Sequence, residues 1–156
     1  MICLLAKDAR ALEGLPLKLL ISVMIIAMSA QPLYGSLSYL NYSSNLGAAV
    51  QGAEAIKKGA LSAFVGGPGN VRKVAIHLDG GSNSFSIRLG GGEDESRSRT
   101  IDVLWHGSIA ATVSLEGRGL SIVCLDGKDI IIEGSQELLL TCIVGRCGDV
   151  VIAEAI

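Results

Sequence analysis

Apolar residues are concentrated in the first third of the chain. No charged side chain occurs between Lys18 and Glu54, and the densest part, Leu19–Ala30, is nearly all apolar. About 20 consecutive apolar residues are needed to cross a bilayer, and Leu15–Leu33 reaches this length if Lys18 extends its amine to the interface. The pattern therefore predicts one helix that spans a membrane or packs into a dense assembly.

Two alternatives remain for this segment. A buried core helix of a soluble domain would need a second long apolar helix to pack on it, and the sequence offers none. A cleaved secretory signal would end in a small-residue site, for which Ala27-Met28-Ser29-Ala30 is a candidate. However, the residues ahead of the apolar run are numerous and include acids, and helix-compatible sequence continues beyond Ala30.

From Leu37 to Val65 the sequence is rich in Ala, Ser, Asn and Gln, and its apolar residues recur at spacings of three, four and seven. This spacing predicts one stripe on a helix, made of Leu46, Ala49, Val50, Ala53, Ala60, Leu61 and Phe64. Alanine allows close approach but buries little area alone, so we expect the stripe to pack against other copies of the chain. The glycines and the proline of Gly66–Asn70 end the helix.

Beyond this junction the pattern changes to short apolar runs separated by turn signals such as Asp126-Gly127. The candidate strands are Val71–Leu78, Ser84–Leu89, Thr100–Trp105, Ala110–Leu115, Leu120–Leu125, Asp129–Glu133, Glu137–Val144 and Val150–Ala155. Strands of this length and spacing are typical of an antiparallel sandwich. The expected fold class is α+β, with a long hydrophobic helix over residues 12–65, a junction at 66–70 and a β-sandwich-like domain over 71–156.

The composition also indicates that part of the chain is surrounded by a membrane or a dense assembly and not by water. The sequence is 49% hydrophobic and 18% charged, whereas soluble domains carry roughly 25% charged residues. The net charge of −2 supplies no basic field to neutralise phosphates. We therefore predict no nucleic-acid binding.

The amino-terminal residues carry a resemblance to a known family. Arg10 and Ala11 precede Leu12, with Gly14 third after that point, and an apolar helix follows. Together with the Gly-Pro-Gly junction and the β domain, this order resembles an archaeal type IV pilin or archaellin. In that family a dedicated peptidase cuts after a basic residue followed by Gly or Ala. The resemblance implies cleavage between Ala11 and Leu12, which would remove residues 1–11 as a leader.

Two further segments resemble the same family: Gly67–Ile76 matches the passage from helix to first strand, and Ile130–Ile152 matches the closing hairpin. The resemblance implies a filament subunit at the cell surface that is anchored in the membrane before assembly. Its partners would be identical subunits, a prepilin peptidase and the pilus assembly machinery. The assembly helix would pack through Leu19, Ile21, Val23, Ile25, Ile26, Ala49, Val50, Ala53 and Ala60.

Two other function classes stay open. The first is a membrane-anchored extracellular β-domain protein, for example an adhesion protein, that does not polymerise. The second is a secreted hydrolase, which is supported only by isolated serines and histidines. His77 and His106 lack a second ligand at metal spacing, and no Gly-x-Ser-x-Gly elbow occurs. We expect no enzyme activity, no cofactor and no metal, and we interpret the acidic and basic loop over residues 90–99 as a solvated hairpin tip.

Cysteines and one sequon are the candidate modification sites. Cys142 and Cys147 flank a four-residue stretch short enough for a hairpin, so we predict a disulfide between them in an oxidising exterior. A bridge between Cys124 and Cys142, or reduced and buried thiols, are the alternatives; cleavage of the leader would remove Cys3. Asn41, in Asn41-Tyr42-Ser43, is an N-glycosylation candidate.

Overall fold

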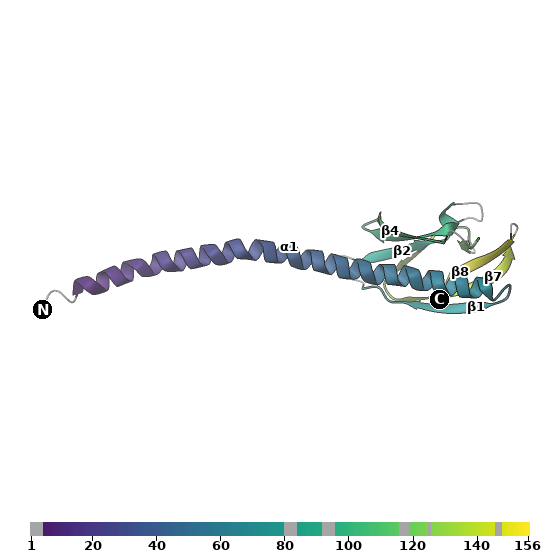
Figure 1. Cartoon of the computed structure of the whole chain (residues 1–156), viewed down its shortest axis with the longest axis horizontal. Helices are drawn as coiled ribbons and strands as arrows, with labels where there is room; N and C mark the ends of the chain where they lie inside the picture. Colours follow the sequence, from purple (N-terminus) through teal and green to yellow (C-terminus); the bar gives the residue numbers. More distant parts are fainter. Residues whose placement is uncertain (1–4, 80–83, 92–95, 116–118, 125, 146–147) are drawn as a thin grey trace. The chain divides into compact units, whose positions relative to one another are not determined.

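The computed structural model describes residues 5–79, 84–91, 96–115, 119–124, 126–145 and 148–156, with only the backbone described for residues 5–16, 33 and 148. Over these residues the chain forms a long helix and eight strands (Figure 1). The elements are α1 (Leu5–Val65), β1 (Val71–Ile76), β2 (Phe85–Leu89), the 3-10 turn η1 (Ser96–Arg99), β3 (Thr100–Trp105), β4 (Ser108–Ser114), β5 (Ile122–Cys124), β6 (Ile130–Glu133), β7 (Gln136–Gly145) and β8 (Gly148–Ala155). The α+β class is confirmed, and each expected strand overlaps an observed one.

The strands form two four-stranded sheets. The first sheet has the order β1-β7-β8-β5 and the second the order β4-β3-β2-β6. All pairs are antiparallel except β5 with β8, which run parallel with Ile122 opposite Val151. The expected antiparallel arrangement thus includes one parallel pair, at the edge of the first sheet. A parallel pair requires a long connection, and here β6 and β7 lie between the two strands in sequence.

The chain divides into two compact units, Met1–Asn41 and Tyr42–Ile156. The second half of α1 therefore belongs to the same unit as the strands, which we call the β unit. The change from helical to strand pattern predicted a junction at residues 66–70. That junction is a turn within the β unit, since Gly69 N–H donates to the Cys142 carbonyl at 2.8 Å and Cys142 N–H donates to the Asn70 carbonyl at 2.9 Å.

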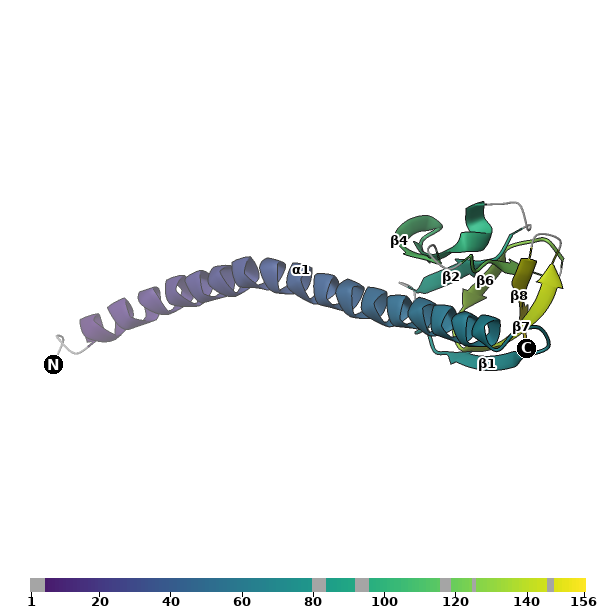
Figure 2. The ribbon, with the colours of Figure 1, turned by 45° about the vertical axis from the view of Figure 1, so that its right-hand side comes forward.

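The second half of α1 supplies part of the core of the β unit. Figures 1 and 2 show it between β1 of the first sheet and β2 of the second. A Cβ atom added at Gly59 would lie 2.5 Å from a methyl of Val74 on β1, and one added at Gly52 would lie 3.1 Å from a methyl of Ile87 on β2. Small residues are needed where a helix approaches strands this closely. Five side chains of this half have no exposed surface: Ala49, Ala53, Ile56, Ala60 and Ala63.

An aromatic cluster lies where the chain enters the β unit. The ring of Tyr42 is 5.4 Å from that of Phe85 and 5.0 Å from that of Trp105, between ring centroids. Trp105 ends β3, and the turn to β4 consists of His106 and Gly107, both with positive φ (48° and 78°). Positive φ at both central residues is the type I′ pattern, which suits the twist of a two-residue hairpin. The turn thus fixes Trp105 at a hairpin tip.

Candidate membrane and assembly segment

The first half of α1 exposes its apolar side chains. We call residues 17–40 the apolar segment; every described side chain in it is exposed. Its Leu, Ile, Val and Met side chains are 48% to 70% exposed. Each such side chain is stabilised by about 1.5–3 kcal/mol when removed from water. The segment therefore requires a partner other than water.

The serines of this segment can be accommodated in an apolar environment. Ser22, Ser29 and Ser36 donate their hydroxyls to the carbonyls four residues earlier, at 2.7–2.9 Å, and Ser38 donates to the Gly35 carbonyl at 2.9 Å. A hydroxyl bonded to its own helix leaves no unpaired donor when water is absent. The serines are thus compatible with lipid or with neighbouring helices.

The helix is long and apolar enough to cross a membrane. Over Leu17–Val65 its most apolar window has a mean hydropathy of 1.6, and none of that window is buried. A core helix of a soluble domain would be covered by the rest of the chain. The exposed window disagrees with the buried-core alternative, and the helix is consistent with membrane anchoring.

The predicted assembly residues fall into two groups. Those of the apolar segment, Leu19, Ile21, Val23, Ile25 and Ile26, are exposed and available to lipid or to another copy. The downstream group does not face outward. Ala49, Ala53 and Ala60 are fully buried in the core of the chain itself, and Val50 packs against that core.

The expectation that this alanine stripe packs on other copies is therefore wrong. A periodic stripe of small residues signals close approach, but it does not identify the neighbour as a helix or a strand. Ile56 and Ala63 belong to the same buried face and were missed, although both continue the spacing of three and four from Ala53 and Ala60.

The predicted processing site lies at the start of the helix. The backbone of Arg10, Ala11, Leu12 and Gly14 is helical within α1. Their side chains lie outside the described residues, so cleavage between Ala11 and Leu12 stays a prediction.

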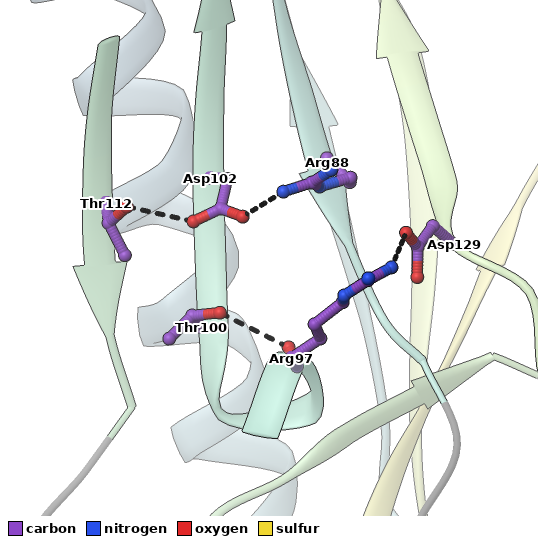
Figure 3. A network of polar contacts seen from close by, with 6 residues as sticks. All are labelled: Arg88, Arg97, Thr100, Asp102, Thr112 and Asp129. Atoms are coloured by element: carbon purple, nitrogen blue, oxygen red, sulfur yellow. Dashed lines mark hydrogen bonds and ion pairs between the residues drawn. The ribbon is translucent and has the colours of Figure 1, made fainter. Parts of the chain in front are cut away.

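A polar network lies on the second sheet (Figure 3). Asp102 on β3 accepts a hydrogen bond from Arg88 on β2 at 2.6 Å and another from Thr112 on β4 at 2.9 Å. Arg97 of η1 reaches Asp129, before β6, at 3.3 Å. Asp102 is 8% exposed, so its charge is held by two donors from neighbouring strands. The network carried no signal in the sequence, because only the strand register brings these residues together.

The cysteines do not form the alternative bridge. Cys124 and Cys142 are free, buried thiols. They lie on β5 and β7, with β8 between them, so their Cα atoms are separated by about two strand spacings of roughly 4.8 Å, beyond the reach of roughly 7 Å for a disulfide. Cys3 and Cys147 lie outside the described residues, and the bridge from Cys142 to Cys147 stays a prediction.

Burial raises the pKa of the Cys124 thiol and of the Cys142 thiol above the ordinary value. Nearby carboxylates act in the same direction, Asp129 and Asp126 on Cys124 and Asp149 on Cys142. Because the thiolate is the reactive form, the raised pKa lowers the reactivity of both free thiols at neutral pH. Cys124 fills space at the edge of the first sheet, where its Sγ lies 3.7 Å from the Leu89 carbonyl.

The remaining candidates are spread over the surface. His77 is exposed, with Nδ1 3.2 Å from the hydroxyl of Ser135, and His106 belongs to the β3–β4 turn. Within the described residues no group of three His, Cys, Asp or Glu side chains could hold a metal; the acidic residues 93–95 lie outside them. Asn41 is exposed on α1, which leaves its side chain accessible for modification.

Comparison with protein-family models, with curated proteins and with solved structures finds no match for this chain. The function is therefore inferred from the chain's own residues, above all from the exposed apolar segment.

Proposed function

We propose that this chain is the structural subunit of a type IV pilus-like surface filament, in which the apolar segment anchors the precursor in the membrane and later packs with the same segment of other copies. The observation that supports this best is the contrast between the two halves of α1. The second half is buried by the strands of the chain itself, whereas residues 17–40 expose large apolar side chains and carry one charge, on Lys18.

Helix packing supplies the driving force for assembly. Transfer from lipid to contact with other helices exchanges one apolar environment for another, so the gain comes from close packing rather than from leaving water. Ala27, Ala30 and Gly35 are small enough to let neighbouring helices approach. If each copy contacts the next head to tail, through a rotation that does not close the copies into a ring, the result is an open helical filament.

The β unit suits the water-exposed part of such a filament. Its own core is complete, because the second half of α1 fills the space between its sheets. The second sheet carries Arg88, Thr112 and Glu133 on the face away from that core. The unit can therefore fold around its own helix without help from a neighbour.

The alternative, an anchored β-domain protein that does not polymerise, differs in what it requires from the apolar segment. An anchor requires only that the segment is hydrophobic. A filament also requires side chains small enough for close packing between helices. The double substitution Ala27→Leu and Ala30→Leu raises hydrophobicity while filling the space that close helix packing uses. Ile26→Leu preserves both volume and hydrophobicity and is the matched control.

We expect negative-stain microscopy of sheared surface material to show ordered fibres for the wild type and for Ile26→Leu. The double variant should fractionate with membranes but form no fibres. Wild-type protein that stays in the membrane without forming ordered fibres would favour the non-polymerising anchor. Fibres of normal abundance from the double variant would show that the apolar segment is not the packing surface.

A further inference from the structure

Amphipathic aromatic side chains occur at the end of the apolar segment and again at the start of the β unit. Tyr34, Tyr39 and Tyr42 lie within nine residues of α1, and Trp105 contacts Tyr42 with ring centroids 5.0 Å apart. Tyr34 is 80% exposed, Tyr39 70% and Trp105 36%. Amphipathic rings of these two types are enriched where a bilayer meets water, because the ring prefers the acyl boundary and the polar atom prefers the headgroups.

The position of the tyrosines matches the thickness of a membrane. At about 1.5 Å per residue, the helix rises about 24 Å from Lys18 to Tyr34 and about 32 Å from Lys18 to Tyr39. The hydrocarbon core of a bilayer is about 30 Å thick. With the Lys18 amine at one boundary, the two tyrosines therefore bracket the level at which the hydrocarbon ends on the other side.

The β3–β4 hairpin adds a second, independent element. Tyr42 is the first residue of the β unit, so its contact with Trp105 places this hairpin tip at the end of the unit where the chain enters. The tip also exposes Ile109, at 58%. From residue 103 to residue 115 the sequence holds no Asp, Glu, Lys or Arg. The tip can therefore enter a headgroup layer without removing a full charge from water.

We infer that Tyr42 and Trp105 form an aromatic collar of the β unit that rests, with the β3–β4 hairpin tip, in the lipid headgroup layer of the anchored precursor. This inference rests on the membrane-anchored precursor of the proposed function and adds to it a lipid contact by the β unit. The partner is the interfacial layer of a bilayer. In sequence, Tyr39 near the end of the apolar segment is followed three residues later by Tyr42, the first residue of the β unit.

The chain carries its own probe, because Trp105 is the sole tryptophan. The full chain is reconstituted in phosphatidylcholine vesicles that contain lipids brominated either near the headgroups or near the bilayer centre. Bromine quenches tryptophan fluorescence only at close range. We expect the fluorescence of Trp105 to be lost with the shallow label and retained with the deep one.

Two variants in a Trp105→Phe background calibrate the depth scale. Ile25→Trp places the probe in the middle of the apolar segment and should be quenched by the deep label. Val144→Trp places it on an exposed site of β7 near the far end of the β unit and should be quenched by neither.

The outcomes separate this inference from the proposed function. If Trp105 is unquenched at both depths while Ile25→Trp responds to the deep label, anchoring stands and the collar is wrong. Stronger quenching of Trp105 by the deep label than by the shallow one would also overturn the collar. If Ile25→Trp does not respond, the membrane anchoring in the proposed function fails as well.

Discussion

Ala53 has no exposed surface, and the adjacent Gly52 lies close to Ile76 of one sheet and Ile87 of the other. Ala53 is part of the buried core of the β unit, where a larger side chain would have to displace its neighbours. The packing of this residue therefore reports on the folding of a single chain. Its place in a periodic alanine stripe had suggested a contact with other copies, but the residue is buried within its own chain.

Replacement of Ala53 by Phe should destabilise the β unit. Overpacking a closed core costs typically 1–3 kcal/mol, because neighbouring side chains must leave their preferred rotamers. The free energy of unfolding of the full chain in detergent, measured with urea, should fall by about this amount. Ala55→Phe is the matched control, since Ala55 is exposed two residues along the same helix.

A loss in Ala53→Phe no larger than that in Ala55→Phe would mean that the helix does not pack between the sheets at this level.

At the scale of elements, two glycines of α1 differ in how much space surrounds them. A Cβ added at Gly59 would lie 2.5 Å from Val74 Cγ2 and 3.1 Å from Leu140 Cδ1, whereas nothing lies within 4 Å of one added at Gly47. Val74 is β-branched and stiff in χ1, so it cannot turn aside easily. The glycine at 59 is thus required by the approach of β1, and the glycine at 47 is not.

Gly47→Ala should therefore stabilise the chain, by up to about 1 kcal/mol, through the higher helix propensity of alanine. Gly59→Ala gains the same propensity but loses more through the contact with Val74, so its free energy of unfolding should fall below that of the wild type. Chemical unfolding of the two variants side by side gives the comparison. Equal stabilisation by both would place α1 farther from β1 than described.

The positions of the helix and the strands could be predicted from the sequence. Which strands pair, and what the helix packs against, could not. Each strand was predicted because Gly and Asp turns bound short apolar runs, a signal that is local. The parallel pairing of β5 with β8 and the ion pair of Arg88 with Asp102 depend on register between distant residues, for which local pattern carries no information. The alanine stripe is a similar case. Its spacing indicated a close contact, but only the tertiary fold determines which element makes that contact.

The apolar segment was predictable for the opposite reason. Its signal is the absence of charge over a long stretch, which survives without any knowledge of tertiary contacts, and the exposed side chains of residues 17–40 agree with it. The contact between Tyr42 and Trp105, from which the aromatic collar is inferred, was not foreseen, because the two residues are far apart in sequence and meet only through the β3–β4 hairpin.

At the scale of the whole molecule, processing should precede assembly. Arg10 and Ala11 stand ahead of the apolar run and Gly14 is third after the expected cut, so the mature chain should begin at Leu12. Mass spectrometry of protein from sheared surface material should show the loss of residues 1–11. Recovery of an intact amino end from fibres would contradict the processing while leaving the fold unchanged.

Assembly through a segment without charge also predicts how fibres respond to solvent. Residues 19–53 carry no formal charge, so contacts made by this stretch have no ion pair for salt to screen. Raising the ionic strength to about 1 M shortens the Debye length to about 3 Å and should leave fibre length unchanged in sedimentation and microscopy. Detergent competes for the same apolar side chains and should release monomers. Fibres that dissolve in salt but resist detergent would instead place the contact on the charged surface of the β unit.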